Sequence, residues 1–151
     1  MALNKMDLTT GYPASVREPL FGIVQLRRAI DKGTALAQGT IGEYHYNCPM
    51  DKEVFSFLGI DHEALLERIK SANNFSDIEA YVKPYVEKKS PAELEAWNAE
   101  WLQDAPETGS DGEKYLRSMV DAKDPSRKDI TTWADMLDLD EGREVPVRTA
   151  A

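Results

Sequence analysis

A stretch of ten residues, 42–51, carries most of the side chains in this chain that could do chemistry. It contains the only cysteine, Cys48, one of the two histidines, His45, and two of the six tyrosines. Pro49 biases the residue before it toward extended backbone, so we expect residues 43–48 to form a short extended or loop segment. In an extended segment side chains alternate, which places Glu43, His45 and Asn47 on one side and Tyr44, Tyr46 and Cys48 on the other.

The titratable side of this segment predicts acid–base chemistry. A carboxylate beside an imidazole stabilises its protonated form and fixes its tautomer, so Glu43 could orient His45 as a general base or acid. Tyr46 would be a second proton donor, and Tyr44 and Asn47 would contact the substrate. The structural interpretation is that the tyrosines pack into the core while His45 lies half-exposed. The sequence leaves both interpretations open.

A metal site at the same segment is a weaker hypothesis. His45 and Cys48 form an H-x-x-C pair, which Glu43, Asp51 or His62 could complete. Zinc sites are usually marked by two ligand pairs, and this chain offers one at most, so we expect no metal and no cofactor. A lone thiol more often packs as a small apolar residue, which is the interpretation favoured for Cys48.

A second unusual feature lies on a helix predicted for residues 16–38. Arg27 and Asp31 are four residues apart and can form an ion pair along the helix. Both fall on the apolar arc of Leu20, Ile23, Val24 and Ile30. If this arc faces the core, burying the pair costs desolvation, which a function would explain. Otherwise the apolar arc shifts around the helix along its length, and both Arg27 and Asp31 are exposed to solvent. A pocket beside this helix would join Arg27, as an anchor for a substrate carboxylate, with Asp31 and His45.

The elements that must position these residues are helices. Serine and glutamate three residues apart, the spacing of a capping box, recur at Ser15, Ser76, Ser90 and Ser110. Pro91 follows one of these serines at the first helical position, where its missing N–H costs nothing. Apolar spacing predicts helices at about 16–38, 50–58, 112–120 and 132–139, and after Asp61, Ser76 and Ser90. We therefore expect an all-α fold, a compact bundle of about six helices with one extended or loop segment at 43–48.

Length and composition limit the remaining possibilities. With 151 residues we expect a single domain over 1–151, with 1–12 and 143–151 poorly ordered or peripheral. The net charge of −9 argues against a nucleic-acid partner. There is no signal-peptide pattern, and no apolar stretch approaches the roughly 20 residues of a membrane span, so we expect a cytoplasmic protein with no membrane partner.

Several runs of residues together resemble one protein family. The longest is Gly39-Thr40-Ile41-Gly42-Glu43-Tyr44-His45-Tyr46-Asn47-Cys48-Pro49-Met50-Asp51, flanked by Ile30-Asp31-Lys32 and Phe57-Leu58-Gly59-Ile60-Asp61. Ser90-Pro91-Ala92-Glu93, Ala96-Trp97-Asn98 and residues 132–143 extend the similarity. The sequence resembles domain-of-unknown-function family 5069. The resemblance implies a soluble, mainly helical, single-domain bacterial protein, and it implies no activity or catalytic residue.

Two functions are consistent with these observations. The first is binding of a small molecule at residues 43–51, as in a cofactor-independent acid–base enzyme such as a lyase, hydratase or isomerase. The alternative is a non-catalytic interaction module, self-associating as a homo-oligomer through Trp97 and Trp101. Exposed tryptophans would favour the second function. We favour small-molecule binding.

Overall fold

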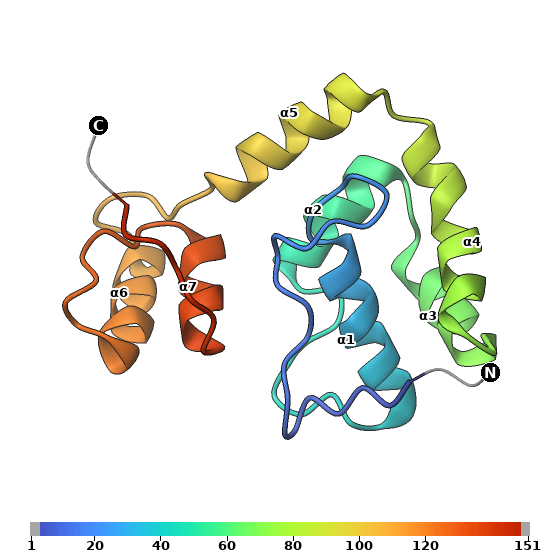
Figure 1. The fold of residues 1–151 in the computed structure, drawn as a ribbon, viewed down its shortest axis with the longest axis horizontal. Helices are drawn as coiled ribbons and strands as arrows, with labels where there is room; N and C mark the ends of the chain where they lie inside the picture. The colour runs from blue at the N-terminus through green and yellow to red at the C-terminus, as the bar shows by residue number, and fades with distance from the viewer. Residues whose placement is uncertain (1–3, 149–151) are drawn as a thin grey trace. The chain divides into compact units, whose positions relative to one another are not determined.

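The computed structural model describes residues 4–148, and these residues form an all-α fold. The helices are α1 (Leu26–Gln38), α2 (Pro49–Leu58), α3 (His62–Ser71), α4 (Phe75–Glu87), α5 (Pro91–Leu102), α6 (Asp111–Lys123) and α7 (Trp133–Asp140) (Figure 1). Within residues 4–148 the only β pairing is an isolated bridge between Leu20 and Ile23. The predicted helical bundle is thus confirmed. No described helix has the length and apolar character needed to cross a membrane.

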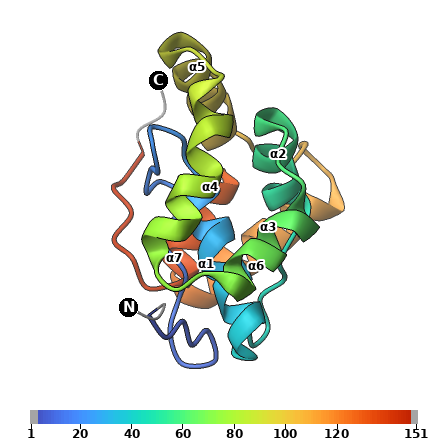
Figure 2. The same cartoon turned by 90° about the vertical axis from the view of Figure 1, so that its right-hand side faces the viewer.

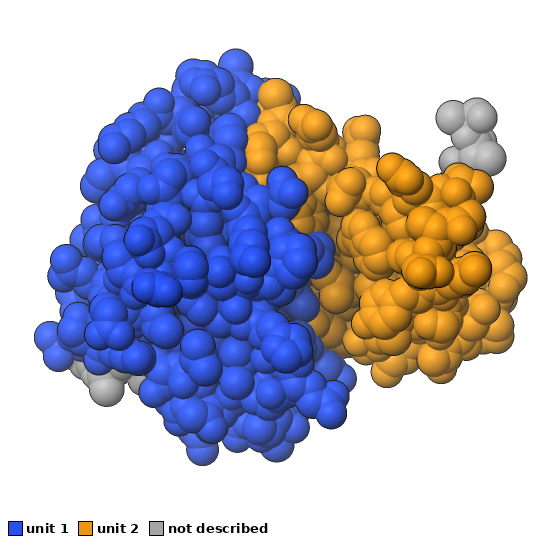
Figure 3. Space-filling view, turned by 180° about the vertical axis from the view of Figure 1, so that it is seen from behind, with its two compact units in different colours: residues 1–95 blue, residues 96–151 orange. Residues whose placement is uncertain are grey.

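The chain divides into two compact units, residues 1–95 and residues 96–151, and the division falls inside α5 (Figure 3). Each unit is described by itself below. The single domain expected over residues 1–151 stays a prediction.

Unit 1 is built around α1, which packs against α2 and α3, while α3 packs against α4 (Figure 2). Its start is fixed to the end of α1, because the Leu8 N–H donates to the Thr40 carbonyl (2.8 Å) and the Thr40 hydroxyl donates to the Met6 carbonyl (2.7 Å). The core is made of buried aliphatic side chains from all four of these helices: Leu26, Ile30, Val54, Leu58, Leu65, Ile69, Ile78 and Val82.

The first helix is shorter than predicted, because α1 begins at Leu26 rather than near residue 16. Pro19 lacks a backbone donor, and Phe21 and Gln25 have φ angles of 53° and 71°, which no right-handed helix contains. The Ser15 hydroxyl accepts the Arg17 N–H in a turn and caps no helix. Four apolar residues are therefore buried from an irregular segment rather than from a helical face: Val16, Leu20, Ile23 and Val24.

The other helix starts are set mostly as predicted. The box at Ser90 is complete, because its hydroxyl accepts the Glu93 N–H (3.1 Å) and the Glu93 carboxylate accepts the Ser90 N–H (3.0 Å). Ser110 caps α6. The prediction at Ser76 was wrong: α4 begins at Phe75, and the N-cap is Asn74, two residues before Ser76. This helix also continues through Pro84 to Glu87.

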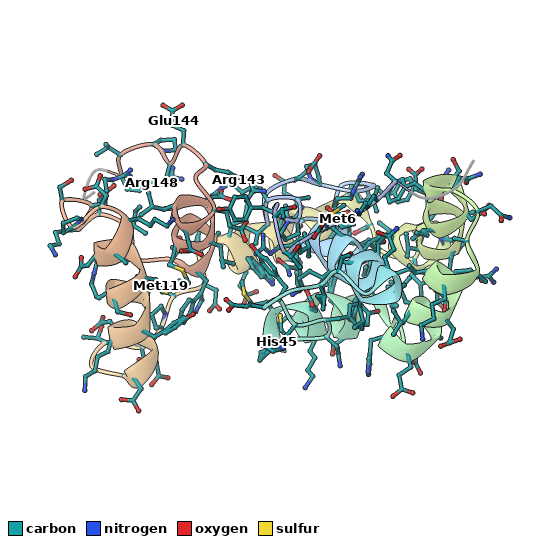
Figure 4. All side chains as sticks on the ribbon, turned by 90° about the horizontal axis from the view of Figure 1, so that it is seen from below. Met6, His45, Met119, Arg143, Glu144 and Arg148 are labelled. Carbon is teal, nitrogen blue, oxygen red and sulfur yellow. The ribbon has the colours of Figure 1, made fainter. Side chains whose placement is uncertain are left out.

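Unit 2 packs α6 against α7 around a small apolar cluster of Leu116, Val120, Ile130, Met136 and Val145. Arginines tie the chain around this cluster. Arg127 makes a two-point ion pair with Asp129, with both N···O distances 3.0 Å, and also donates to the carbonyls of Val145 and Pro146. Arg148, labelled in Figure 4, makes a second two-point pair with Asp135 (2.9 and 3.0 Å). These contacts hold residues 145–148 to the connection between α6 and α7.

The Asp129 carboxylate should make unit 2 sensitive to acid. Its hydrogen bonds from Arg127 and from the Arg148 N–H hold the pKa of Asp129 well below its ordinary value. A carboxyl group whose pKa is lowered by folding stabilises the fold above its unfolded pKa of about 4, and this stabilisation is lost as the pH falls below that value. We expect Asp129→Asn to melt at a lower temperature than the wild type at neutral pH. The gap should shrink on acidification, as measured by circular dichroism melts over a pH series.

Asp121→Asn is the matched control, because Asp121 is more exposed and pairs with the exposed Lys128. Equal acid sensitivity in the wild type and Asp129→Asn would contradict the assignment.

Candidate functional site

Residues 43–48 form a turn-rich loop that lies against α1. The Arg28 guanidinium lies 5.7 Å from the centre of the Tyr44 ring. Tyr46 packs where α1 has Gly33, and a Cβ added to this glycine would lie 2.9 Å from a Tyr46 ring carbon. The loop can approach this closely only because the helix has no side chain there.

The end of the loop reaches α1 through a buried ion pair. The Lys32 ammonium lies 2.8 Å from Asp51 Oδ2, and the side chains are 5% and 0% exposed. The same ammonium donates to Cys48 Sγ (3.2 Å). Cys48 is the N-cap residue of α2 and Asp51 lies in its first turn, so one lysine of α1 fixes the start of α2.

Gln25 completes this cluster, which we call the lysine cluster: Gln25, Lys32, Cys48 and Asp51. Its amide nitrogen donates to Asp51 Oδ1 (2.9 Å), and the residue is 0% exposed. Gln25 Oε1 has no hydrogen-bond partner among the described residues. Asp51 Oδ2 has none either, because Lys32 approaches it at ion-pair distance but outside hydrogen-bond geometry. The ammonium beside Asp51 Oδ2 compensates that oxygen. Buried polar atoms are normally satisfied, so the unpartnered Gln25 Oε1 needs an explanation.

The backbone around the lysine cluster is strained. Gln25 and Asn47 adopt φ angles of 71° and 60°, in the left-handed region that non-glycine residues rarely occupy. Asparagine tolerates this conformation well, but glutamine does not, so the fold holds Gln25 in place at a cost of order 1–3 kcal/mol. Strain of this kind concentrates at functional sites.

The predicted pair of Arg27 and Asp31 forms on α1, with a distance of 3.4 Å between Arg27 Nε and Asp31 Oδ1. The pair is partly buried: the Asp31 side chain is 8% exposed and the Arg27 side chain is 34% exposed. Burial raises the pKa of Asp31, and the Ala14 N–H and the Arg27 guanidinium oppose this shift. Arg27 also lies 4.1 Å from the centre of the Phe75 ring.

The remaining predicted residues are spread over the loop. His45 and Glu43 are exposed, His45 at the edge of unit 1 (Figure 4), and no hydrogen bond or ion pair joins them within residues 4–148. The Tyr46 hydroxyl donates to the His62 carbonyl (2.7 Å), so it could transfer a proton only after breaking this bond. Burial, and then the charge of Asp51, raises the pKa of Tyr46. The proposed roles of these residues stay predictions.

Sequence reasoning missed two members of the lysine cluster. Lys32 follows Asp31 in the sequence, but on a helical wheel it falls outside the apolar arc that singled out Asp31, so that pattern did not include it. No local sequence pattern marks Gln25, because it lies before α1 and its side chain reaches Asp51 only through a strained backbone conformation. Among the described residues, no group of three or more histidine, cysteine, aspartate or glutamate side chains is placed to hold a metal ion.

Residues 10–143 match the family described as Domain of unknown function (DUF5069), so the chain belongs to this family. The matched range includes residues 25–51 and thus the whole lysine cluster. No match is found among curated proteins.

The buried ion pair should make Asp51 one of the most sensitive positions in unit 1. In Asp51→Ala the Lys32 ammonium stays buried without its carboxylate, and we expect a loss of about 3–5 kcal/mol in the free energy of unfolding. Denaturant unfolding followed by far-UV circular dichroism measures this loss. Glu53→Ala, at an exposed position of the same helix, is the control and should change the value by less than about 0.5 kcal/mol. Equal effects of the two substitutions would mean that Lys32 escapes to solvent.

Proposed function

We propose that this member of domain-of-unknown-function family 5069 binds a small polar molecule at the lysine cluster and acts on it by acid–base chemistry. The observation that carries the proposal is the unsatisfied Gln25 Oε1, fully buried beside the Lys32–Asp51 ion pair. A ligand that donates a hydrogen bond to this oxygen would remove the cost of leaving it unpaired, which is about 1–3 kcal/mol.

The cluster also holds the groups that proton abstraction needs. Asp51 is a buried carboxylate, and it would take a proton from carbon or oxygen once a ligand has drawn the Lys32 ammonium away from Oδ2. The Lys32 ammonium lies beside it and would stabilise the negative charge that then develops on a carbonyl or carboxylate oxygen. This combination suits a lyase, hydratase or isomerase.

Access would be from the side of Cys48, the one half-exposed member of the cluster. His45 and Glu43 belong to the same loop and are exposed to solvent, so they could exchange protons with water at the entrance. Asn47 and Tyr44 would then contact the part of the ligand that lies outside the cluster. Asp31 instead accepts the Ala14 N–H and Arg27 lies against the Phe75 ring, so we propose these two residues only as support for the helix.

The alternative function, a self-associating module, depends on exposed tryptophans. Trp101 is buried and Trp97 is half-buried, so the lysine cluster gives the stronger argument. The experiment below tests both functions, since it also reads the oligomeric state.

Native mass spectra of freshly purified protein, with a denatured control, test the proposal first. We expect the wild type to carry an extra mass that is lost on denaturation, and Lys32→Met to lack it. Lys52→Met, an exposed lysine on α2, controls for the loss of one positive charge and should keep the extra mass. Because Lys32→Met leaves Asp51 buried without its partner, a melting curve checks that this variant is folded.

If the native mass is that of the apo protein, a second measurement is thermal shift with a panel of 2-hydroxy acids, whose hydroxyl can donate to Gln25 Oε1. A ligand at about 100 times its Kd stabilises a fold by about 2.7 kcal/mol, so binding would raise the melting temperature of the wild type and Lys52→Met but not of Lys32→Met. If no acid distinguishes Lys32→Met from the other two proteins, the proposal fails, and a dimer mass in the spectra would then favour self-association.

A further inference from the structure

We propose that unit 1 has a second binding site, for a small aromatic anion, in the groove between α3 and α4. The groove has a volume of about 570 Å³, within the range of about 300–1,000 Å³ that is usual for small-molecule sites. It follows the contact between the two helices, which lie side by side in Figure 2. The residues that line it include Arg68, Asn73, Asp77, Tyr81 and Tyr85.

One wall of the groove is aromatic. Tyr81 and Tyr85 are one turn apart on α4, and their ring centres are 5.7 Å apart with planes tilted by 52°. Both side chains are half-buried, so part of each ring faces solvent in the groove. A flat ring of a ligand could pack on this pair in a stacked or edge-to-face arrangement.

Two cations flank the tyrosine pair. The Arg68 Cζ lies 5.2 Å from the centre of the Tyr81 ring, and the Lys88 Nζ lies 5.3 Å from the centre of the Tyr85 ring. Within residues 4–148 neither cation forms a salt bridge. This distinguishes both from the other cations of these helices, because Lys70 pairs with Glu67 and Lys83 pairs with Glu87.

One acidic side chain, Asp77, lines the groove. Asp77 Oδ2 accepts the Asn73 N–H (2.8 Å) at the start of α4, and within residues 4–148 no ion pair joins Asp77 to Arg68. The hydrogen-bond donors of Arg68 are therefore not taken up by this carboxylate, although its negative charge remains in the groove.

These features select the chemistry of the ligand. A guanidinium group binds a carboxylate or phosphate through two parallel hydrogen bonds, and a tyrosine pair binds a flat ring. A molecule with only a flat ring or only an anionic group would contact either the tyrosine pair or Arg68, but not both. Benzoate, which has both, is the simplest probe. Benzamide keeps the ring without the charge, and acetate keeps the charge without the ring.

The experiment is a titration of the full ¹⁵N-labelled chain with each probe, followed by ¹H–¹⁵N NMR. We expect benzoate to shift amide signals of residues 68–88 in a saturable way, and to bind at least about tenfold more tightly than benzamide or acetate, as the loss of one charge-assisted contact predicts. Arg68→Gln should reduce benzoate affinity by about tenfold. Lys70→Gln removes the same charge from the same helix outside the groove, and should leave the affinity unchanged.

Three outcomes would overturn the proposal: no saturable shift in residues 68–88, equal binding of the three probes, or equal effects of Arg68→Gln and Lys70→Gln. Arg68 is exposed, so its substitution should leave the fold intact, which a melting curve checks. The site shares no residue with the lysine cluster. Shifts confined to residues around 25, 32, 48 and 51 would contradict the groove and support the cluster.

Discussion

The buried ion pair between Lys32 and Asp51 constrains more of unit 1 than any other polar contact. An ammonium that is 5% exposed must keep its carboxylate, so the start of α2 must lie against the middle of α1. This position in turn places Cys48 at the N-cap of α2 and brings the loop 43–48 along the helix. The unusual backbone conformation of Gln25 belongs to the same arrangement, because it positions the Gln25 side-chain amide to donate to Asp51 Oδ1.

The two units solve the problem of buried charge in different ways. Unit 1 encloses the Lys32–Asp51 ion pair and leaves Gln25 Oε1 beside it without a hydrogen bond among the described residues, which is the kind of imbalance that a ligand can correct. Unit 2 instead uses arginines in two-point pairs with aspartates, and Arg127 also donates to backbone carbonyls. This network holds residues 145–148 in place. Arg117 Nε in unit 2 is also buried without a hydrogen-bond partner among the described residues. In unit 1 such an atom lies beside a buried lysine and a buried carboxylate, so we place the chemistry there.

Within unit 1 the lysine cluster and the groove between α3 and α4 differ in character. The cluster is enclosed, ionic and strained, which suits a small polar molecule held close to a proton acceptor. The groove is open and aromatic, and Arg68, which lines it, forms no salt bridge within residues 4–148, which suits reversible binding of a larger flat anion. Membership of domain-of-unknown-function family 5069 favours neither of these two roles. The choice between them depends on these side chains alone.

Local sequence signals determined the helices and most of their ends. Ser90 and Glu93 cap their helix through contacts three residues apart, and the glycines at 39 and 59 end theirs in the left-handed conformation, so no distant residue was needed to predict them. The pairing of Arg27 with Asp31 was predictable for the same reason. The lysine cluster was not, because Lys32 and Asp51 meet only when α1 and α2 pack. The irregular segment before α1 was also decided by tertiary structure, since its apolar residues fit a helical pattern and the burial of Gln25 against the rest of unit 1 holds that residue in its strained conformation.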